Sequence, residues 1–479
     1  MKIVQTLWTG RKDLLRDEFG WISPEYHLIS WALSCLKLRE FYDNVVLYTD
    51  SQGKRILGDY LHLPYTKIEV VYDNLKCREA HWAYPKIVTY SLQDEPFLHV
   101  DGDVILSRPI DKNIIDAELI AQNKEIISDY YKNMVNDIMR RRTILPSYLK
   151  KDIENGSFGS YNAGLLGGSD INYIKKYCEE ANKIINDNGM NDPTESNMAV
   201  NNNILFEQIL FYSMVKNDKR EVKTVIEHDV QDNGYSYKEF ADFYLYGEYP
   251  LIHMLGGHKR NYKVCELMKK MLLKISPDLI KEINMLFKCK HIRLESKNNE
   301  LSDMSIQMCV GKYLDELKQK VIKWKNIPHD LLFENEKRSS LYLDFMIDKD
   351  KYYNDYIFKC NSYIEIFLIP KEWPEEAKIL IRDRIDRKKS LKPLNIAIIP
   401  LLYGNKGYSE ILINDLQYNI ISLSKKGVSY EDLFKYLKSC FTPEVVISDE
   451  KLRDLIKTEI EYLAYNKLLF VFRDHHMRS

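Results

Sequence analysis

The sequence predicts an α/β protein whose first half forms a mostly parallel, Rossmann-like sheet with helices on both faces. Two observations support this fold class. Strand-like and helix-like runs alternate from residue 2 to about residue 100. The strand-like runs are almost entirely apolar, which is typical of parallel strands buried on both faces. Ligands of such sheets bind at the carboxyl ends of the strands, and Asp50 and Asp101 stand at two of these ends.

The elements of this alternation follow from the spacing of apolar residues. Strands are predicted at residues 2–8, 44–50, 67–73 and 97–100, and helices at residues 27–42, 51–61 and 84–93. Later in the chain, the patterns predict a strand at 161–168 and helices at 171–187, 203–215, 264–288 and 301–325.

The length of 479 residues suits two or three domains. We expect an α/β domain at 1–265, a helical extension at 266–330 and an α+β C-terminal domain at 331–479. Within the last, Ser429 to Asp432 forms an N-cap signature before an amphipathic helix. The outline of helix, turn, two helices and strand predicts a winged-helix-like module at 409–473.

Composition excludes several classes of function. The formal net charge is -1, so no overall charge attracts the chain to nucleic acid or to an acidic membrane. The eight cysteines are scattered without a C-x-x-C pair, which speaks against a zinc ribbon and favours a reduced, cytoplasmic setting. No membrane span and no signal peptide are expected, because no long apolar run and no apolar leader segment occur.

The stretch "EPFLHVDGDVIL" places two carboxylates, Asp101 and Asp103, directly after an apolar strand. Buried charges are costly unless they are compensated. A divalent cation with oxygen ligands would compensate both, and Gly102 would let the backbone approach a ligand closely. An Asp-x-Asp in a polar loop would be an ordinary solvated turn, whereas these apolar flanks favour a metal site.

A later stretch, "LIHMLGGHKRN", gives His253, Gly256 and Lys259 in H-x-x-G-x-x-K spacing. Histidine is a common ligand of transition metals. The lysine can neutralise a departing diphosphate. His253 alone would be read as a core histidine, but together with Asp101 and Asp103 it predicts a site for a metal and a diphosphate.

The segments "HVDGDV", "YNAGLLGG", "FEQ" and "HMLGGHK" occur in an order that resembles GT-A-fold glycosyltransferases, especially glycosyltransferase family 8. The chain looks closest to an uncharacterised bacterial glycosyltransferase-like branch, over roughly residues 1–265. The resemblance implies that Asp101, Asp103 and His253 hold Mn²⁺ (or Mg²⁺) and that Lys259 binds the donor diphosphate.

The resemblance also implies roles for other residues. Glu207 and Gln208 would face the transferred sugar as catalytic residues, although family 8 usually has Asp-Gln-Asp there. Where that family has Pro-Trp after the lysine, this chain has Arg260 and Asn261. The remaining donor-binding candidates are Thr6, Trp8 and Thr9 at the base, Lys86 in place of an arginine, Gly102, Asn162, Ala163 and Gly164 at the sugar, and Gly256 and Gly257.

These residues predict an enzyme, a metal-dependent hexosyltransferase that moves a hexose from a nucleotide sugar, with a UDP-sugar favoured, to a hydroxyl group of a peptide or glycan. Retention of configuration is implied by the resemblance. One alternative is a catalytically weak sugar-nucleotide-binding scaffold whose C-terminal module recruits a peptide or protein partner. Another is a nucleotidyltransferase, to which "LWTGRKD" contributes one glycine and two basic residues.

The C-terminal module could also bind a partner. Its predicted recognition helix carries Glu431 and Asp432, which oppose DNA phosphates, so no nucleic acid is expected. The module weakly resembles small winged-helix modules that recruit precursor peptides to maturation enzymes. A structural or oligomerisation role stays equally open.

Overall fold

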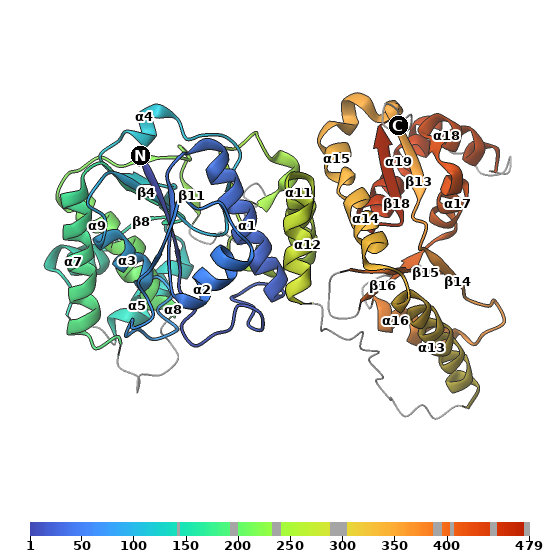
Figure 1. The fold of residues 1–479 in the computed structure, drawn as a ribbon, viewed down its shortest axis with the longest axis horizontal. Coiled ribbons are helices and arrows are strands. Elements are labelled where there is room, and N and C mark those ends of the chain that lie inside the picture. Colours follow the sequence, from blue (N-terminus) through green and yellow to red (C-terminus); the bar gives the residue numbers. More distant parts are fainter. Residues whose placement is uncertain are drawn as a thin grey trace. The chain divides into compact units, whose positions relative to one another are not determined.

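The computed structural model describes residues 1–140, 144–191, 200–231, 241–287, 304–386, 395–402, 407–440 and 448–473. The chain divides into two compact units, Met1–Leu272 and Leu273–Ser479, whose helices and strands are labelled in Figure 1 where there is room. Parts of two predicted segments, residues 288–303 of the helical extension and 441–447 of the winged-helix-like module, lie outside the described residues.

The first unit contains alternating strands and helices, as the apolar spacing predicts. Its strands are Lys2–Leu7 (β1), Val45–Thr49 (β2), Lys67–Val70 (β3), Phe97–Val100 (β4), Val104–Leu106 (β5), Ile120–Ala121 (β6), Lys124–Ile126 (β7), Ser160–Tyr161 (β8), Leu165–Gly168 (β9), Lys223–Thr224 (β10), Val230–Gln231 (β11) and Leu251–His253 (β12). Its helices and helical turns are Pro24–Phe41 (α1), Ser51–Gly53 (α2), Lys54–Tyr60 (η1), Tyr84–Ser91 (α3), Lys112–Ile115 (α4), Asp129–Met139 (α5), Ser147–Glu154 (α6), Ile171–Asp187 (α7), Val200–Ile204 (α8), Leu205–Ile209 (η2), Leu210–Asn217 (α9), Phe243–Leu245 (η4), Gly256–Arg260 (η5) and Tyr262–Ile275 (α11).

The central sheet has seven strands in the order β10-β6-β9-β4-β1-β2-β3. Strands β3, β2, β1 and β4 are parallel, and β9 runs antiparallel between β4 and β6. The chain is therefore a mixed α/β protein with a parallel-rich sheet, which confirms the fold class at this level. From β1 the chain continues to β2 and β3 on one side and returns to β4 on the other. The carboxyl ends of β1 and β4 thus form a topological switch point, where such sheets bind ligands.

Both faces of this sheet are covered. On one face, Val4, Tyr48 and Leu166 pack into a core with residues of α3, α7 and α9. On the other, Ile3 and Leu98 pack with Leu38 of α1. Figure 1 shows α7 and α9 on one side of the sheet and α1 on the other. Burial on both faces explains why the strands carry few polar residues.

The predicted helix at 264–288 is two helices, α11 and Pro277–Leu286 (α12), because Pro277 has no amide hydrogen with which to continue α11 and begins α12 instead. The predicted helix at 51–61 is α2 followed by the π-helical turn η1. Two further features differ from the pattern read in the sequence. The predicted strand at 161–168 is split into β8 and β9, because the Asn162 side chain accepts a hydrogen bond from the Gly164 amide at 2.9 Å and turns the chain between them. The predicted helix at 203–215 contains a π-helical turn, η2. Both irregularities lie beside the candidate site described below, and π-helical turns are frequent at functional sites.

The second unit combines helices with two small antiparallel sheets, of strand orders β17-β13-β18 and β14-β15-β16. Its helices and helical turns are Pro277–Leu286 (α12), Met304–Lys325 (α13), His329–Ser339 (α14), Leu341–Tyr352 (α15), Tyr353–Asp355 (η6), Glu375–Ile385 (α16), Asp415–Leu423 (α17), Ser424–Lys426 (η7), Tyr430–Ser439 (α18) and Asp449–Tyr465 (α19). Its strands are Tyr356–Cys360 (β13), Glu365–Leu368 (β14), Asn395–Pro400 (β15), Tyr408–Ile413 (β16), Val428–Ser429 (β17) and Leu469–Arg473 (β18).

The predicted N-cap of α18 is confirmed, because the Ser429 hydroxyl accepts a hydrogen bond from the Asp432 amide at 3.2 Å. Gly427 precedes this cap with a φ of 91°, a conformation that favours glycine and turns the chain out of the preceding helix. Within the described parts of both units, no helix combines the length and the apolar character that crossing a bilayer requires.

Candidate functional site

The turn between β4 and β5 carries Asp101 and Asp103 at the switch point of the sheet. Strand β5 pairs antiparallel with β12, in a register that places His253 opposite Val104. The amide of Met254, the next residue, donates to the Asp103 carbonyl at 3.0 Å. This pairing brings together two sequence motifs that are 150 residues apart. The pairing of β5 with β12 cannot be read from the local sequence, because strand register is set by the tertiary structure.

Asp101, Asp103 and His253 could hold a metal ion, since one ligand atom from each lies within 4.8 Å of the others. The His253 Nε2 atom is 3.5 Å from an Asp103 carboxylate oxygen. The side chains of Asp103 and His253 are largely buried, at 13% and 4% exposure. Two carboxylates and one imidazole suit a cation such as Mn²⁺. The three predicted ligands therefore meet in one place.

Gln122 is a residue of this site that sequence reasoning missed. Its side-chain oxygen lies 2.8 Å from His253 Nδ1. A hydrogen on Nδ1 would leave Nε2 free as a lone-pair donor toward Asp103, which is the usual arrangement of a metal-binding histidine. Gly164 packs so closely here that a Cβ atom would stand 2.4 Å from the Gln122 oxygen. A glutamine after a two-residue strand carries no motif by which it could have been found.

Replacing Gln122 with Met is expected to weaken Mn²⁺ binding by about 10–100-fold, because His253 loses the acceptor that fixes its ring. The fold should persist, since Met has a similar volume. Mn²⁺ titration followed by electron paramagnetic resonance measures the affinity, and thermal unfolding checks the fold. An unchanged Mn²⁺ affinity in a folded variant would contradict this role of Gln122.

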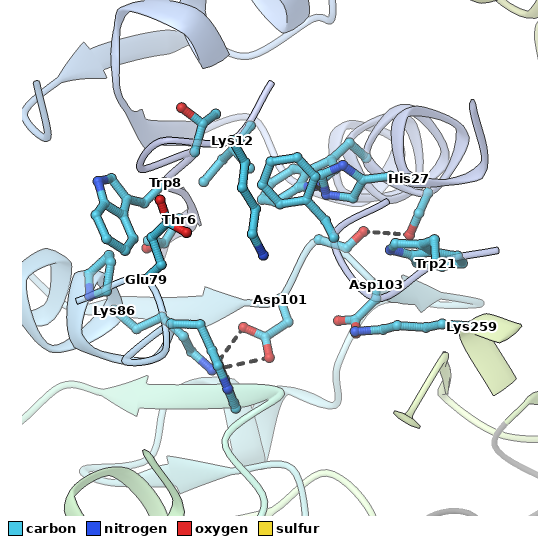
Figure 2. Close-up of a pocket in the computed structure, with 18 residues that line it drawn as sticks. Thr6, Trp8, Lys12, Trp21, His27, Glu79, Lys86, Asp101, Asp103 and Lys259 are labelled. Atoms are coloured by element: carbon cyan, nitrogen blue, oxygen red, sulfur yellow. Dashed lines mark hydrogen bonds and ion pairs between the residues drawn. The ribbon is translucent and has the colours of Figure 1, made fainter. Parts of the chain in front are cut away.

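Two lysines neutralise the carboxylates from opposite sides, as Figure 2 shows. Lys86 contacts Asp101 at 2.9 Å, Glu207 at 2.5 Å and the Ala163 carbonyl at 3.1 Å. Lys259 contacts Asp103 at 2.5 Å. The Lys86 ammonium thus lies among two carboxylates and a carbonyl, whereas Lys259 is held by a single carboxylate in the described part of the chain.

These surroundings shift the pKa values of the two aspartates in opposite directions. Burial raises the pKa of the Asp101 carboxyl above its usual value, although Lys86 opposes the rise. For Asp103, burial also acts to raise the pKa, but the Lys259 ammonium and His253 outweigh it and hold the pKa well below its usual range. Asp103 is therefore firmly ionised and is the stronger candidate ligand for a cation.

Glu207 lies on the π-helical turn η2 and is fully buried against Lys86. Burial raises the pKa of the Glu207 carboxyl to about 7, with Lys86 opposing the rise. In this arrangement Glu207 orients Lys86 toward Asp101. Gln208, its neighbour, accepts hydrogen bonds from Tyr131 and Ser160 at 3.2 Å.

The raised pKa predicts how Glu207 affects stability with pH. Its ordinary pKa is 4.5 and its folded-state pKa is about 7, so the folded state binds this proton more tightly. The free energy of unfolding therefore falls as the pH rises through that window. Glu207→Gln has no titrating group here and lacks this fall. The free energy of unfolding of the variant minus that of the parent should therefore be about 3 kcal/mol larger at about pH 8 than at about pH 5. Urea unfolding of both proteins at the two pH values measures the difference, and an equal difference at both would contradict it.

The predicted Asn-Ala-Gly segment supports the site through its main chain. The Ala163 carbonyl accepts from Lys86, and the Gly164 carbonyl accepts from the Asp101 amide at 2.9 Å. The Asn162 side chain donates to Glu125 at 3.1 Å. Glu125, on β7, was not predicted; it also accepts from Tyr131 at 2.7 Å. This buried network links the neighbourhood of Asn162 to that of Gln208.

A cavity of about 230 Å³ opens over the carboxylates. Figure 2 shows Lys12 reaching toward its centre and Trp8 and Trp21 at its sides. Predicted residues that line it are Thr6, Trp8, Thr9, Lys86, Asp101, Gly102, Asp103 and Lys259, and lining residues that sequence reasoning missed include Lys12, Phe19, Trp21, His27, Trp31, Glu79 and Trp82. Of the other predicted residues, Asn162, Ala163, Gly164, Glu207, Gln208, His253, Gly256 and Gly257 lie outside the lining of this cavity.

A wider hollow of about 1050 Å³ adjoins this cavity and shares Trp8, Thr9, Lys12 and Glu79 with it. It follows the carboxyl ends of β2 and β3, where Asp50 and Asp73 lie. The Thr9 hydroxyl and amide both donate to Asp50, at 2.8 and 2.6 Å, so this threonine shapes the wall between the two hollows. Together the two hollows extend from the carboxylates along the sheet edge.

Comparison with known families assigns the chain to one of them. A model of a family of unknown function, DUF6734, matches residues 1–286, which is more than half of the chain. The chain belongs to this family. No curated protein matches the chain significantly. The DUF6734 match contains every residue of the candidate site, from Thr6 to Lys259.

Proposed function

We propose that the chain is a metal-dependent glycosyltransferase of the GT-A type, which transfers a hexose from a nucleotide sugar to a hydroxyl acceptor. A UDP-sugar is the preferred donor in this proposal. One observation carries it: Asp101, Asp103 and His253 converge within 4.8 Å at the switch point, with Lys259 beside them. A cation site flanked by a lysine suits a diphosphate ester.

The residues present fit a divalent cation. His253 is oriented by Gln122 so that Nε2 faces Asp103, and Asp103 is held ionised by its neighbours. When bound, a divalent cation such as Mn²⁺ or Mg²⁺ would supply Lewis-acid stabilisation of the nucleoside diphosphate leaving group. Asp101, Asp103 and His253 would hold it.

The protein's own groups would then share the work of transfer. Lys259 would neutralise charge that develops on the departing diphosphate. Lys86, held by Glu207, would keep Asp101 in position. The acceptor oxygen would form a bond to C1 of the sugar while the bond from C1 to the diphosphate oxygen breaks, and the acceptor proton would leave with a phosphate oxygen or water. The family 8 resemblance favours retention of configuration.

The aromatic residues around the cavity support a nucleotide-sugar ligand. Trp8 lies where the two hollows meet, so its ring could stack on a base or a sugar. Trp82 is 47% exposed although it lines the same cavity, which places apolar surface at the opening. Such surface suits a sugar ring, whose axial hydrogens pack on aromatic faces.

For the C-terminal unit we propose a winged-helix-like module within residues 409–473 that binds a peptide or protein. Support comes from the succession α17, β17, α18, α19 and β18, in which β17 and β18 both pair with β13. Glu431 on α18 forms an ion pair with Arg453 at 2.7 Å. This helix therefore presents a balanced rather than a basic surface, which suits a peptide or protein better than DNA.

The test is nucleotide release. The full chain is incubated with Mn²⁺ and a panel of UDP- and GDP-sugars, with and without peptide and oligosaccharide acceptors, and released nucleotide is quantified. Nucleoside diphosphate release that depends on Mn²⁺ supports the proposal. Binding without turnover would instead indicate a sugar-nucleotide-binding scaffold, and pyrophosphate release from nucleoside triphosphates a nucleotidyltransferase. Absence of both binding and release with every donor would overturn the proposal.

A further inference from the structure

We infer that Lys259 makes the site selective for a metal–diphosphate complex over a bare cation. Its ammonium pairs with Asp103 and would transfer to the diphosphate when the complex enters. This inference rests on the proposed function, because it presumes that Asp101, Asp103 and His253 bind a divalent cation. It adds a specificity role for Lys259 that precedes any chemistry.

The first argument is the contrast between the two lysines of the site. Lys86 is 5% exposed, donates hydrogen bonds to Asp101 and the Ala163 carbonyl, and forms an ion pair with Glu207. The Lys259 side chain is 25% exposed, lines the cavity and has one carboxylate partner among the described residues. An ammonium has three donors. Lys259 therefore keeps donors available toward the cavity, whereas Lys86 is fixed.

The second argument is competition for one carboxylate. Lys259 stands 2.5 Å from one Asp103 oxygen, and the other oxygen faces His253 at 3.5 Å. A bare divalent cation bound by Asp103 would share that carboxylate with an ammonium only a few ångströms away. Like charges at this distance repel strongly in a partly buried site. Bare metal therefore has to displace Lys259 or bind against its charge.

A diphosphate removes this conflict. It brings its own negative charge with the metal and offers the ammonium new acceptor oxygens in place of the Asp103 carboxylate. Metal and diphosphate should then bind cooperatively, and each should raise the affinity of the other by the same factor. The ligand that the site accepts best is thus the complex.

The third argument is that the transfer needs only a side-chain movement. The main chain at Lys259 is anchored, because its carbonyl accepts from the Ile22 amide at 3.0 Å. The next helix, α11, is tied to α1 by the hydrogen bond from the Tyr26 hydroxyl to Glu266. The Lys259 ammonium also lies 5.7 Å from the centre of the Trp21 ring, which provides a second favourable surface along its path.

The experiment compares Mn²⁺ binding by the full chain with and without inorganic pyrophosphate, followed by the electron paramagnetic resonance signal of free Mn²⁺. In the parent protein, pyrophosphate should raise the Mn²⁺ affinity by about 10-fold or more. Lys259→Met should bind Mn²⁺ alone about 5-fold or more tightly than the parent, and its pyrophosphate effect should shrink about 10-fold. Bare Mn²⁺ binding by Lys259→Met that is no tighter than in the parent overturns the inference.

Two matched variants separate this role from general effects of charge. Lys132→Met removes a cation at an exposed position on α5, and the inference requires its bare Mn²⁺ affinity to stay within about 2-fold of the parent. A gain equal to that of Lys259→Met would overturn it. Lys259→Arg keeps a cation beside Asp103 and should bind bare Mn²⁺ as weakly as the parent. Tighter binding of Mn²⁺ by this variant would contradict competition between the side-chain cation and Mn²⁺ for the Asp103 carboxylate.

Failure of the inference and failure of the proposed function give different results. If the parent binds Mn²⁺ with pyrophosphate but Lys259→Met gains nothing with Mn²⁺ alone, only the exchange of Lys259 is wrong. If the parent binds no Mn²⁺ with either pyrophosphate or UDP, the metal–diphosphate site itself is wrong and the inference falls with it.

Discussion

Asp103→Asn is expected to lower Mn²⁺-dependent nucleotide release by about 1000-fold while leaving the fold intact. Asp103 is the carboxylate that its surroundings hold most firmly ionised, and it contacts both His253 and Lys259. Its loss would remove a ligand of the cation and the resting partner of Lys259 together. Initial rates at saturating Mn²⁺ with the best donor of the panel measure the effect.

Stability should fall by about 1–3 kcal/mol in this variant, because the lowered pKa of Asp103 means that its ionised carboxylate stabilises the folded chain. The loss stays moderate since the Lys259 side chain is 25% exposed and can reach water when its partner is gone. Asp94→Asn is the matched control, because Asp94 is exposed on the loop before β4. It makes the same chemical change away from the site and should keep full activity. Undiminished release by Asp103→Asn would refute the proposed metal site.

Lys86→Met is expected to have the largest effect on stability, a loss of about 3–5 kcal/mol in the free energy of unfolding. The ammonium lies between Asp101 and the fully buried Glu207. Without it, two carboxylates face each other in a buried site with no counter-charge. Urea unfolding at about pH 8, where Glu207 is largely ionised in the parent, gives the comparison.

A second variant tests the cause of this loss. Lys86→Met combined with Glu207→Gln removes the unpaired buried charge as well, so about half or more of the lost stability should return. Lys132→Met, at an exposed position on α5, should change stability by less than about 0.5 kcal/mol. A loss below about 1 kcal/mol for Lys86→Met would show that the ion pairs at its ammonium contribute little.

Much of the first unit could be predicted from the sequence because its signals are local. Apolar runs bounded by polar residues fix β1, β2 and β4, and the amphipathic spacing predicts α7 with the bounds found in the structure. Where prediction failed, a side-chain hydrogen bond to the backbone, which the apolar pattern does not show, decided the course of the chain. The run at 161–168 is apolar enough for one strand, yet the Asn162 side chain turns it between β8 and β9.

The candidate site shows the same division. Residue type and spacing singled out Asp101, Asp103, His253 and Lys259, because metal ligands and phosphate-binding lysines are rare in apolar surroundings. Two supporting side chains, Gln122 beside His253 and Glu125 beside Asn162, could not be found that way. They act through hydrogen bonds to residues distant in the sequence, and such bonds leave no periodicity or motif in the chain.

By itself, the sequence determined the alternation of elements, the parallel-rich α/β class and the two carboxylates at a strand end. These properties depend on short-range burial patterns and on the chemistry of single side chains. Only the tertiary structure decided that His253 reaches Asp103, that Lys86 is locked between Asp101 and Glu207, and that Lys259 is not. The reason is that strand register and the distance between charged groups are properties of the folded chain, and these distances set which charges are compensated.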